Sequence, residues 1–127
     1  MTAEVSDELR AVAERIASLP RTLLERDDTP LYTLLEESGY LEHHTAITAQ
    51  IIRDVLARDS TLVDDWLAYS SDKRTSSGWF CREDVVGVVV GYVGDHETEN
   101  TKSVYSNRTE ACAEFIKHEV EDLRQCG

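Results

Sequence analysis

Histidine is the side chain best suited to acid–base or metal chemistry near neutral pH, and the sequence has four: His43, His44, His96 and His118. His43 and His44 are adjacent, so they cannot share a helix face, and no two histidines have the spacing of a helical zinc site. His118 and Asp122 stand one helical turn apart and could offer two metal ligands, but this spacing more often marks an exposed polar face. We therefore expect no metal and no cofactor.

Nucleophilic catalysis needs a base beside the nucleophile and a group that stabilises an anion. Cys81 lies in a predicted strand and Cys112 on the apolar stripe of a predicted helix, so both should be small buried hydrophobes. No GxSxG, glycine-rich phosphate loop or HExxH motif occurs. Adjacent carboxylates are frequent, but neighbours on a helix point in different directions. We expect no enzyme, unless a pocket gathers His96 or His118 with carboxylates.

Acidic side chains dominate the charge of this chain of 127 residues, with 25 acids, 13 bases and a formal net charge of −12. A negative field repels nucleic-acid phosphates and anionic lipid headgroups, so direct binding to nucleic acid or to a membrane is disfavoured. The same field favours a basic protein partner. The alternative is that the acidity serves solubility alone.

Two acidic stretches are candidate partner-binding sites. Asp95, Glu97 and Glu99 fall within five residues of a polar connection between two predicted strands, and Glu36 and Glu37 form a second patch on a short predicted helix. Exposed carboxylates of this kind can bind the Lys and Arg side chains of a cationic partner. The other interpretation of the loop is a solvated turn.

The three cysteines, Cys81, Cys112 and Cys126, are odd in number and lack paired spacing, which argues against a disulfide framework. The first residues have no basic region followed by an apolar one, so no signal peptide is predicted. We expect a cytoplasmic protein with free thiols.

The residues from 78 to 106 predict an antiparallel meander, with strands at 79–83, 85–93 and 102–106. In the central run, Val86, Val88, Val90 and Tyr92 form one apolar face. The opposite face has notches at Gly87 and Gly91, which should let a helix pack closely, and both faces should be at least partly covered. We expect the meander to be the core.

Helices are expected on both sides of the meander. Helical spacing and stop signals predict helices from Ser6 to about Ser18, over 31–38 between Pro30 and Gly39, over 45–58, and from Ser60 until a polar loop at 70–77. A last helix, capped by Ser106 or Asn107, should lay an apolar stripe across the glycine-notched face. That stripe is Cys112, Phe115, Ile116, Val120 and Leu123. The sequence thus predicts a single domain over 1–127 of α+β class, with about three to five N-terminal helices.

Four stretches carry a resemblance to a known class of proteins. They are 65–74 (DWLAYSSDKR), 78–80 (GWF), 89–92 (VVGY) and 110–119 (EACAEFIKHE). Together they resemble small bacterial immunity proteins of polymorphic and contact-dependent toxin systems, over roughly residues 60–120. The resemblance implies an inhibitor that binds the toxin domain of its own system, commonly a nuclease, and occludes its active site.

A second hypothesis is a cytosolic chaperone or adaptor for a secreted effector, a class that is also small and acidic. Such chaperones resemble mixed α/β dimers in which strands come early, whereas this chain opens with about 70 residues that are predicted helical. An inhibitor should bind a folded toxin and a chaperone an unfolded segment. A neighbouring gene that encodes a basic C-terminal domain would favour the inhibitor.

Overall fold

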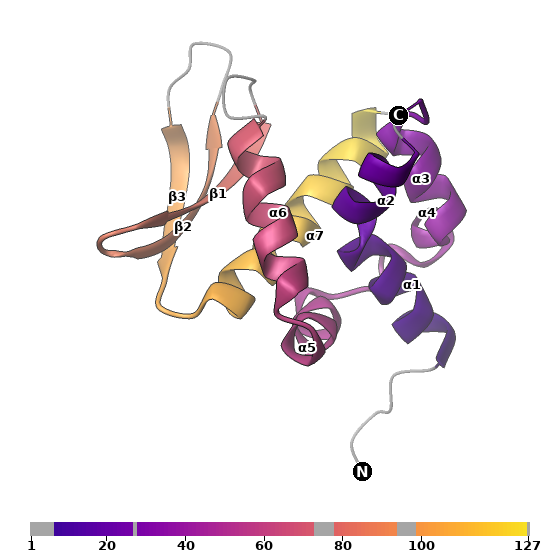
Figure 1. Cartoon of the computed structure of the whole chain (residues 1–127), viewed down its shortest axis with the longest axis horizontal. Coiled ribbons are helices and arrows are strands. Elements are labelled where there is room, and N and C mark those ends of the chain that lie inside the picture. The colour runs from indigo at the N-terminus through magenta and orange to yellow at the C-terminus, as the bar shows by residue number, and fades with distance from the viewer. Residues whose placement is uncertain (1–6, 27, 73–77, 94–98, 127) are drawn as a thin grey trace.

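The long C-terminal helix α7 (Arg108–Cys126) is the centre of the structure, a computed structural model that describes residues 7–26, 28–72, 78–93 and 99–126. It contacts helices α1, α3, α5 and α6 and all three strands. In Figure 1 it runs from the sheet into the group of N-terminal helices. The meander therefore lies at one end of the molecule, and the expectation that it forms the core is corrected: most buried apolar side chains are on helices.

Six helices precede the sheet in the described part of the chain, one more than the upper end of the expected range. They are α1 (Asp7–Ala17), α2 (Leu19–Glu25), α3 (Leu31–Ser38), α4 (Tyr40–His43), α5 (Ala49–Arg58) and α6 (Thr61–Asp72). Two of them, α2 and the short α4, lie outside the helix ranges that the sequence analysis gives. Helix α4 is the shorter of the two. It begins directly after Gly39, whose φ of 90° ends α3 as the sequence predicts.

One helix start and one capping group differ from those that the sequence predicts. The helix expected from Thr45 begins at Ala49, because the Thr48 hydroxyl accepts a hydrogen bond from the Ile51 N–H. At α6 the capping oxygen belongs to Asp59, which accepts from the Thr61 N–H at 3.1 Å, and not to Ser60.

Helix α6 also runs further than expected, through Ser70 and Ser71 to Asp72, into the stretch predicted as a loop. Ser70 is buried, and its hydroxyl accepts a hydrogen bond from the Cys81 N–H at 2.7 Å. The polar serine is thereby satisfied inside the structure, and it fastens the end of α6 to the sheet.

The sheet has strands β1 (Gly78–Asp84), β2 (Gly87–Val93) and β3 (Glu99–Tyr105), in the order β1-β2-β3 and antiparallel throughout. The pairing of Asp84 with Gly87 leaves Val85 and Val86 as a two-residue turn. The predicted central strand is therefore wrong at its first two residues. They are exposed at the end of a hairpin that projects from the body (Figure 1).

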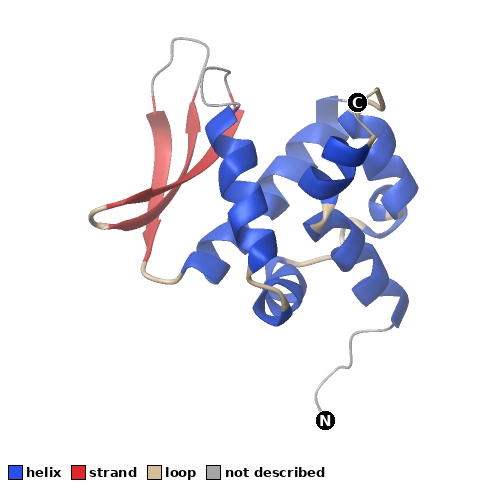
Figure 2. Cartoon of the chain, in the orientation of Figure 1, coloured by secondary structure: helices blue, strands red, loops and turns tan. Residues whose placement is uncertain are grey.

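Helix α7 packs on the face of the sheet opposite to the one expected. Cys81, Val88 and Val90 join its apolar stripe in the core, whereas the glycines of β2 lie on the other face. Branched side chains offer more apolar area to a helix than glycine notches do, which explains the choice. All helices lie to one side of the sheet (Figure 2).

Candidate functional site

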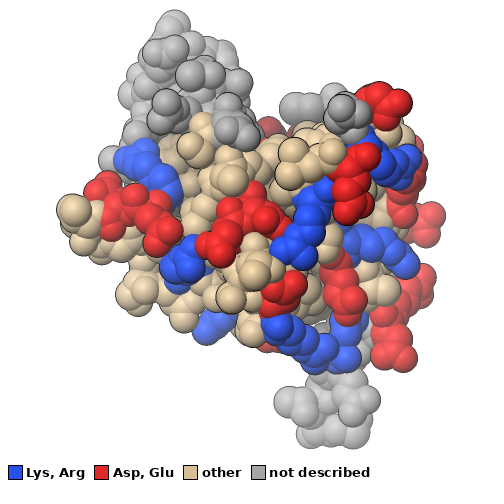
Figure 3. Space-filling model, viewed as in Figure 1, with Lys and Arg blue, Asp and Glu red and all other residues tan. Residues whose placement is uncertain are grey.

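The strongest candidate for a binding site is an acidic surface on the helices far from the sheet. Five exposed carboxylates of the segment α2–α4 make it up, and we call them the acidic face: Glu25, Asp28, Glu36, Glu37 and Glu42. Acidic side chains line the right-hand side of Figure 3, where Figure 1 places α1, α3 and α4. The sequence predicted Glu36 and Glu37 here. It missed Glu25, Asp28 and Glu42, which lie outside α3, in segments that the packing of α3 on α2 and on α4 holds beside it.

One ion pair joins the helices that carry the acidic face. The Arg26 guanidinium donates to the two carboxylate oxygens of Glu37 at 2.6 and 3.4 Å, and this hydrogen bonding lowers the pKa of Glu37. The charge of Asp28 also acts on Arg26, whereas Glu25, Glu36 and Glu42 have no ion-pair partner in the part of the chain that the structure describes. Their charge is thus available to a cation from outside.

The acidic face also offers apolar contacts beside its charges. Leu24, next to Glu25, is 83% exposed. A groove of about 480 Å³ between α1, α2 and α3 has the buried side chains of Leu19 and Leu34 in its lining, together with Arg26 and Glu37. Charged rims around apolar anchors are the usual composition of a protein-binding surface.

Only one of the three acids in the other predicted stretch, Glu99, belongs to the described residues. Asp95 and Glu97 lie outside the described residues. Glu99 is the first residue of β3, where it pairs with Val93. Because β3 and α3 lie at opposite ends of the molecule in Figure 1, the structure does not bring Glu99 together with Glu36 and Glu37.

A cluster of polar side chains around α7 joins α4 to that helix. Lys117 donates to the Tyr40 hydroxyl and to the His44 carbonyl, each at 2.7 Å. Tyr40 in turn donates to Glu121, which Arg124 also contacts at 3.1 Å. Burial lowers the pKa of Lys117. Each polar group here has a partner within the protein, so the cluster is structural.

Buried Glu119 has a similar role between α7 and α6. It accepts a hydrogen bond from the Tyr69 hydroxyl at 2.6 Å. Burial, followed by the charge of Glu119, raises the pKa of Tyr69, so the phenol remains a donor. Every buried side-chain nitrogen or oxygen among the described residues has a hydrogen-bond partner.

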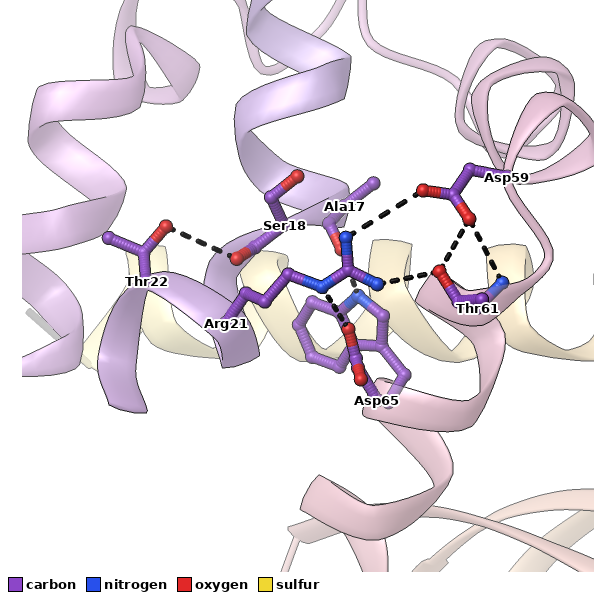
Figure 4. A network of polar contacts seen from close by, with 8 residues as sticks. Ala17, Ser18, Arg21, Thr22, Asp59, Thr61 and Asp65 are labelled. Carbon is purple, nitrogen blue, oxygen red and sulfur yellow. Dashed lines mark hydrogen bonds and ion pairs between the residues drawn. The ribbon is translucent and has the colours of Figure 1, made fainter. Parts of the chain in front are cut away.

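Arg21 links α2 to the start of α6 (Figure 4). Its guanidinium contacts Asp65 at 2.6 Å and the Thr61 hydroxyl at 2.7 Å, and lies 3.7 Å from Asp59. Beside it, the Trp66 indole N–H donates to the Ala17 carbonyl at 2.8 Å. These contacts orient α1, α2 and α6, and their acids are already paired with Arg21.

The histidines within the described ranges do not meet at one site. His43 lies 3.2 Å from Glu8, and His44 lies 3.9 Å from Glu121. His118 stacks on the Trp79 ring, with centroids 3.9 Å apart and planes 9° apart, instead of pairing with Asp122. Among the described residues, no group of three or more His, Cys, Asp or Glu side chains could hold a metal ion.

The cysteine thiols should resist alkylation in the folded protein. Cys81 and Cys112 are free and buried, and burial raises the pKa of Cys81 to about 12 and raises that of Cys112 too. Since the thiolate is the reactive form, both should react slowly at pH 8 and rapidly after unfolding. Mass spectrometry after alkylation without reductant should count three modified cysteines in the unfolded chain. A disulfide in freshly purified protein would contradict the expectation of three free thiols.

The helices of the described part include none that is both long and apolar enough to cross a lipid bilayer. Comparison of the chain with protein-family models, with curated proteins and with solved structures gave no match.

Proposed function

We propose that this protein is an immunity protein that acts in the cytoplasm, where it binds and neutralises a cationic toxin domain by covering its active site. The observation that carries the proposal is the acidic face, on which the exposed carboxylates of Glu25, Glu36 and Glu42 have no ion-pair partner among the described residues. A nuclease must be basic around its substrate, so an acidic protein surface can occupy the same field. A nuclease domain is therefore the partner we propose first.

The arrangement of charge and apolar groups supports a binding protein more than an enzyme. The polar clusters inside the fold are paired internally, while the acidic face is exposed and borders a groove with apolar lining. In complexes of this kind, charge speeds association and a few apolar anchors slow dissociation. Leu24 and the groove are the anchors that we assign to the acidic face.

Inhibition of the toxin encoded beside this gene tests the function. The basic C-terminal domain of the neighbouring reading frame, purified in folded form, should lose its activity when one equivalent of this protein is added. A chaperone would instead bind an unfolded segment of the effector and leave the folded domain active. Full activity in the presence of excess protein would contradict the proposal.

Charge variants test the surface. Glu36→Gln combined with Glu42→Gln should slow association with the toxin domain roughly three- to tenfold at low salt, with little change at high salt, because exposed charges act through a screened field. Stopped-flow kinetics at two ionic strengths would measure this. Asp54→Asn with Glu110→Gln removes the same charge from α5 and α7, and is the matched control.

Variants of the acids in the predicted loop test the alternative site of contact. If Asp95→Asn, Glu97→Gln and Glu99→Gln together slow association while the double variant at Glu36 and Glu42 does not, the contact lies at the sheet end of the molecule. Equal rates for all variants would mean that charge does not guide the encounter.

A further inference from the structure

The groove between α1, α2 and α3 combines apolar lining with charged side chains on two of its helices. The buried side chains of Leu19 and Leu34 belong to its lining, and Ala11 adds a smaller apolar surface. Glu14 on α1 and Glu37 on α3 line it as well. A groove of about 480 Å³ with this composition suits a long side chain that is apolar along its length and charged at its end.

The charge that remains free in this groove is negative. Two arginines line it, and the protein already holds both: Arg15 donates to the Ser38 carbonyl at 2.9 Å, and Arg26 pairs with Glu37 at 2.6 Å. The exposed Glu14 carboxylate has no ion-pair or side-chain hydrogen-bond partner in the described ranges. An anionic ligand would have to displace an existing contact of an arginine, whereas a cationic ligand finds Glu14 unpaired.

The surroundings of the groove favour a cation too. The acidic face lies on the neighbouring segment α2–α4, and the whole chain has a net charge of −12. Arg21 and Arg58 border an adjoining hollow together with Glu14, but neither forms an ion pair with Glu14. A field of negative sign raises the local concentration of cations and lowers that of anions.

Among cationic side chains, arginine fits the groove better than lysine. Its planar guanidinium can donate two parallel hydrogen bonds to one carboxylate, and it is more weakly hydrated than an ammonium group. Its apolar stem can cover Leu19 and Leu34 while the charged end stays near the groove opening. Arginine is also one of the residues that most often dominate the binding energy of protein interfaces.

We propose that the groove between α1, α2 and α3 receives one arginine side chain of the partner protein, with its stem against Leu19 and Leu34 and its guanidinium paired with Glu14. This inference rests on the proposed function, because the toxin domain is the protein that would supply the arginine. It adds a defined anchor to the attraction that the acidic face exerts over a distance.

A small arginine derivative, N-acetyl-arginine methylamide, tests the groove without the toxin. Added to the isotope-labelled full chain and followed by NMR, it should shift the amides of Ala11, Thr22 and Ser38 in a saturable way, with a dissociation constant on the order of 1–10 mM. N-acetyl-citrulline methylamide has a similar shape and no charge. It should bind at least about threefold more weakly, because it forms no ion pair with a carboxylate. Added salt should reduce this difference.

Variants assign the arginine derivative to the groove. Glu14→Gln should weaken its binding about two- to fivefold and leave binding of the citrulline derivative unchanged, because only a charge is lost. Ala11→Leu adds a side chain to the groove without changing charge, and should weaken both derivatives at least about twofold. Asp54→Asn removes one charge from α5, outside the lining of this groove, and is the matched control. Circular dichroism would confirm that each variant is folded.

Three results would overturn the inference. Shifts that spread over the acidic face without saturation would mean a general attraction of cations. Equal binding of the two derivatives, or unchanged binding to Glu14→Gln, would mean that no ion pair forms in the groove.

The inference and the proposed function fail separately. If the toxin is inhibited but the groove does not bind the arginine derivative, the inference is wrong and the proposed function stands. If the groove binds the derivative but the toxin stays active, the proposed function is wrong, and the groove loses the toxin as the source of its arginine.

Discussion

Replacing Phe115 with alanine should lower the free energy of unfolding by about 3–5 kcal/mol, the cost of truncating a buried aromatic side chain and leaving a cavity. Phe115 is fully buried on α7, and its ring meets the edge of Trp66 with centroids 5.9 Å apart. Because α7 contacts both the sheet and the N-terminal helices, the cavity would open where these parts join. Urea unfolding followed by fluorescence and by far-ultraviolet circular dichroism would measure the loss.

A variant on the exposed side of the same helix is the control for Phe115→Ala. Gln125→Ala changes an exposed residue near the end of α7 and should shift stability by less than about 0.5 kcal/mol. A loss below about 1 kcal/mol for Phe115→Ala would show that its ring is not part of the core.

Gly87→Ala should cost about 3 kcal/mol or more, for two reasons that add. The backbone φ of Gly87 is 138°, in a region open mainly to glycine, where other residues are strained by about 1–3 kcal/mol. An added Cβ would also lie 2.6 Å from the Tyr105 carbonyl oxygen, and this backbone atom of the neighbouring strand can move only if the pairing shifts. Thermal and urea unfolding would both report the change.

Gly39→Ala provides the comparison for Gly87→Ala. Gly39 also has positive φ, at 90°, but its added Cβ would meet the side-chain Cγ2 of Val12 at 3.2 Å, an atom that can give way more easily. We expect a loss of about 1–2 kcal/mol there. If Gly39→Ala proves as costly as Gly87→Ala, the contact with Tyr105 contributes nothing, and the backbone angle alone explains both.

The sequence determined the local elements because their signals are local. Apolar residues at helical spacing predicted α1 and α7, and Pro30 and Gly39 predicted both ends of α3. Dense β-branched residues predicted β2, and Asn107 caps α7 as expected, by accepting from the Glu110 N–H at 3.1 Å. These patterns were sufficient for the α+β class and for a helix on the sheet.

The composition likewise pointed to acidic side chains as candidates for binding a basic partner, but it could not say which of them act together. Glu25, Glu36 and Glu42 belong to different helices, and only tertiary packing brings these helices together, with α3 against α2 and against α4. Whether a carboxylate is already paired also depends on distant residues: Arg21 neutralises Asp65, 44 positions away, and leaves Glu36 untouched. Spacing along the chain contains no information of this kind.

The tertiary structure alone decided which face of β2 is covered and where its strand begins. The run from Val85 to Val93 is apolar on both faces, so its pattern fits helix packing on either. The register that pairs Asp84 with Gly87 makes β2 begin at Gly87. Val85 and Val86 therefore form a turn, against their local preference for a strand. The free energies of strand pairing and of helix packing are sums over the whole sheet and α7, so they outweighed the strand preference of two residues. Val85 and Val86 were left exposed as a result.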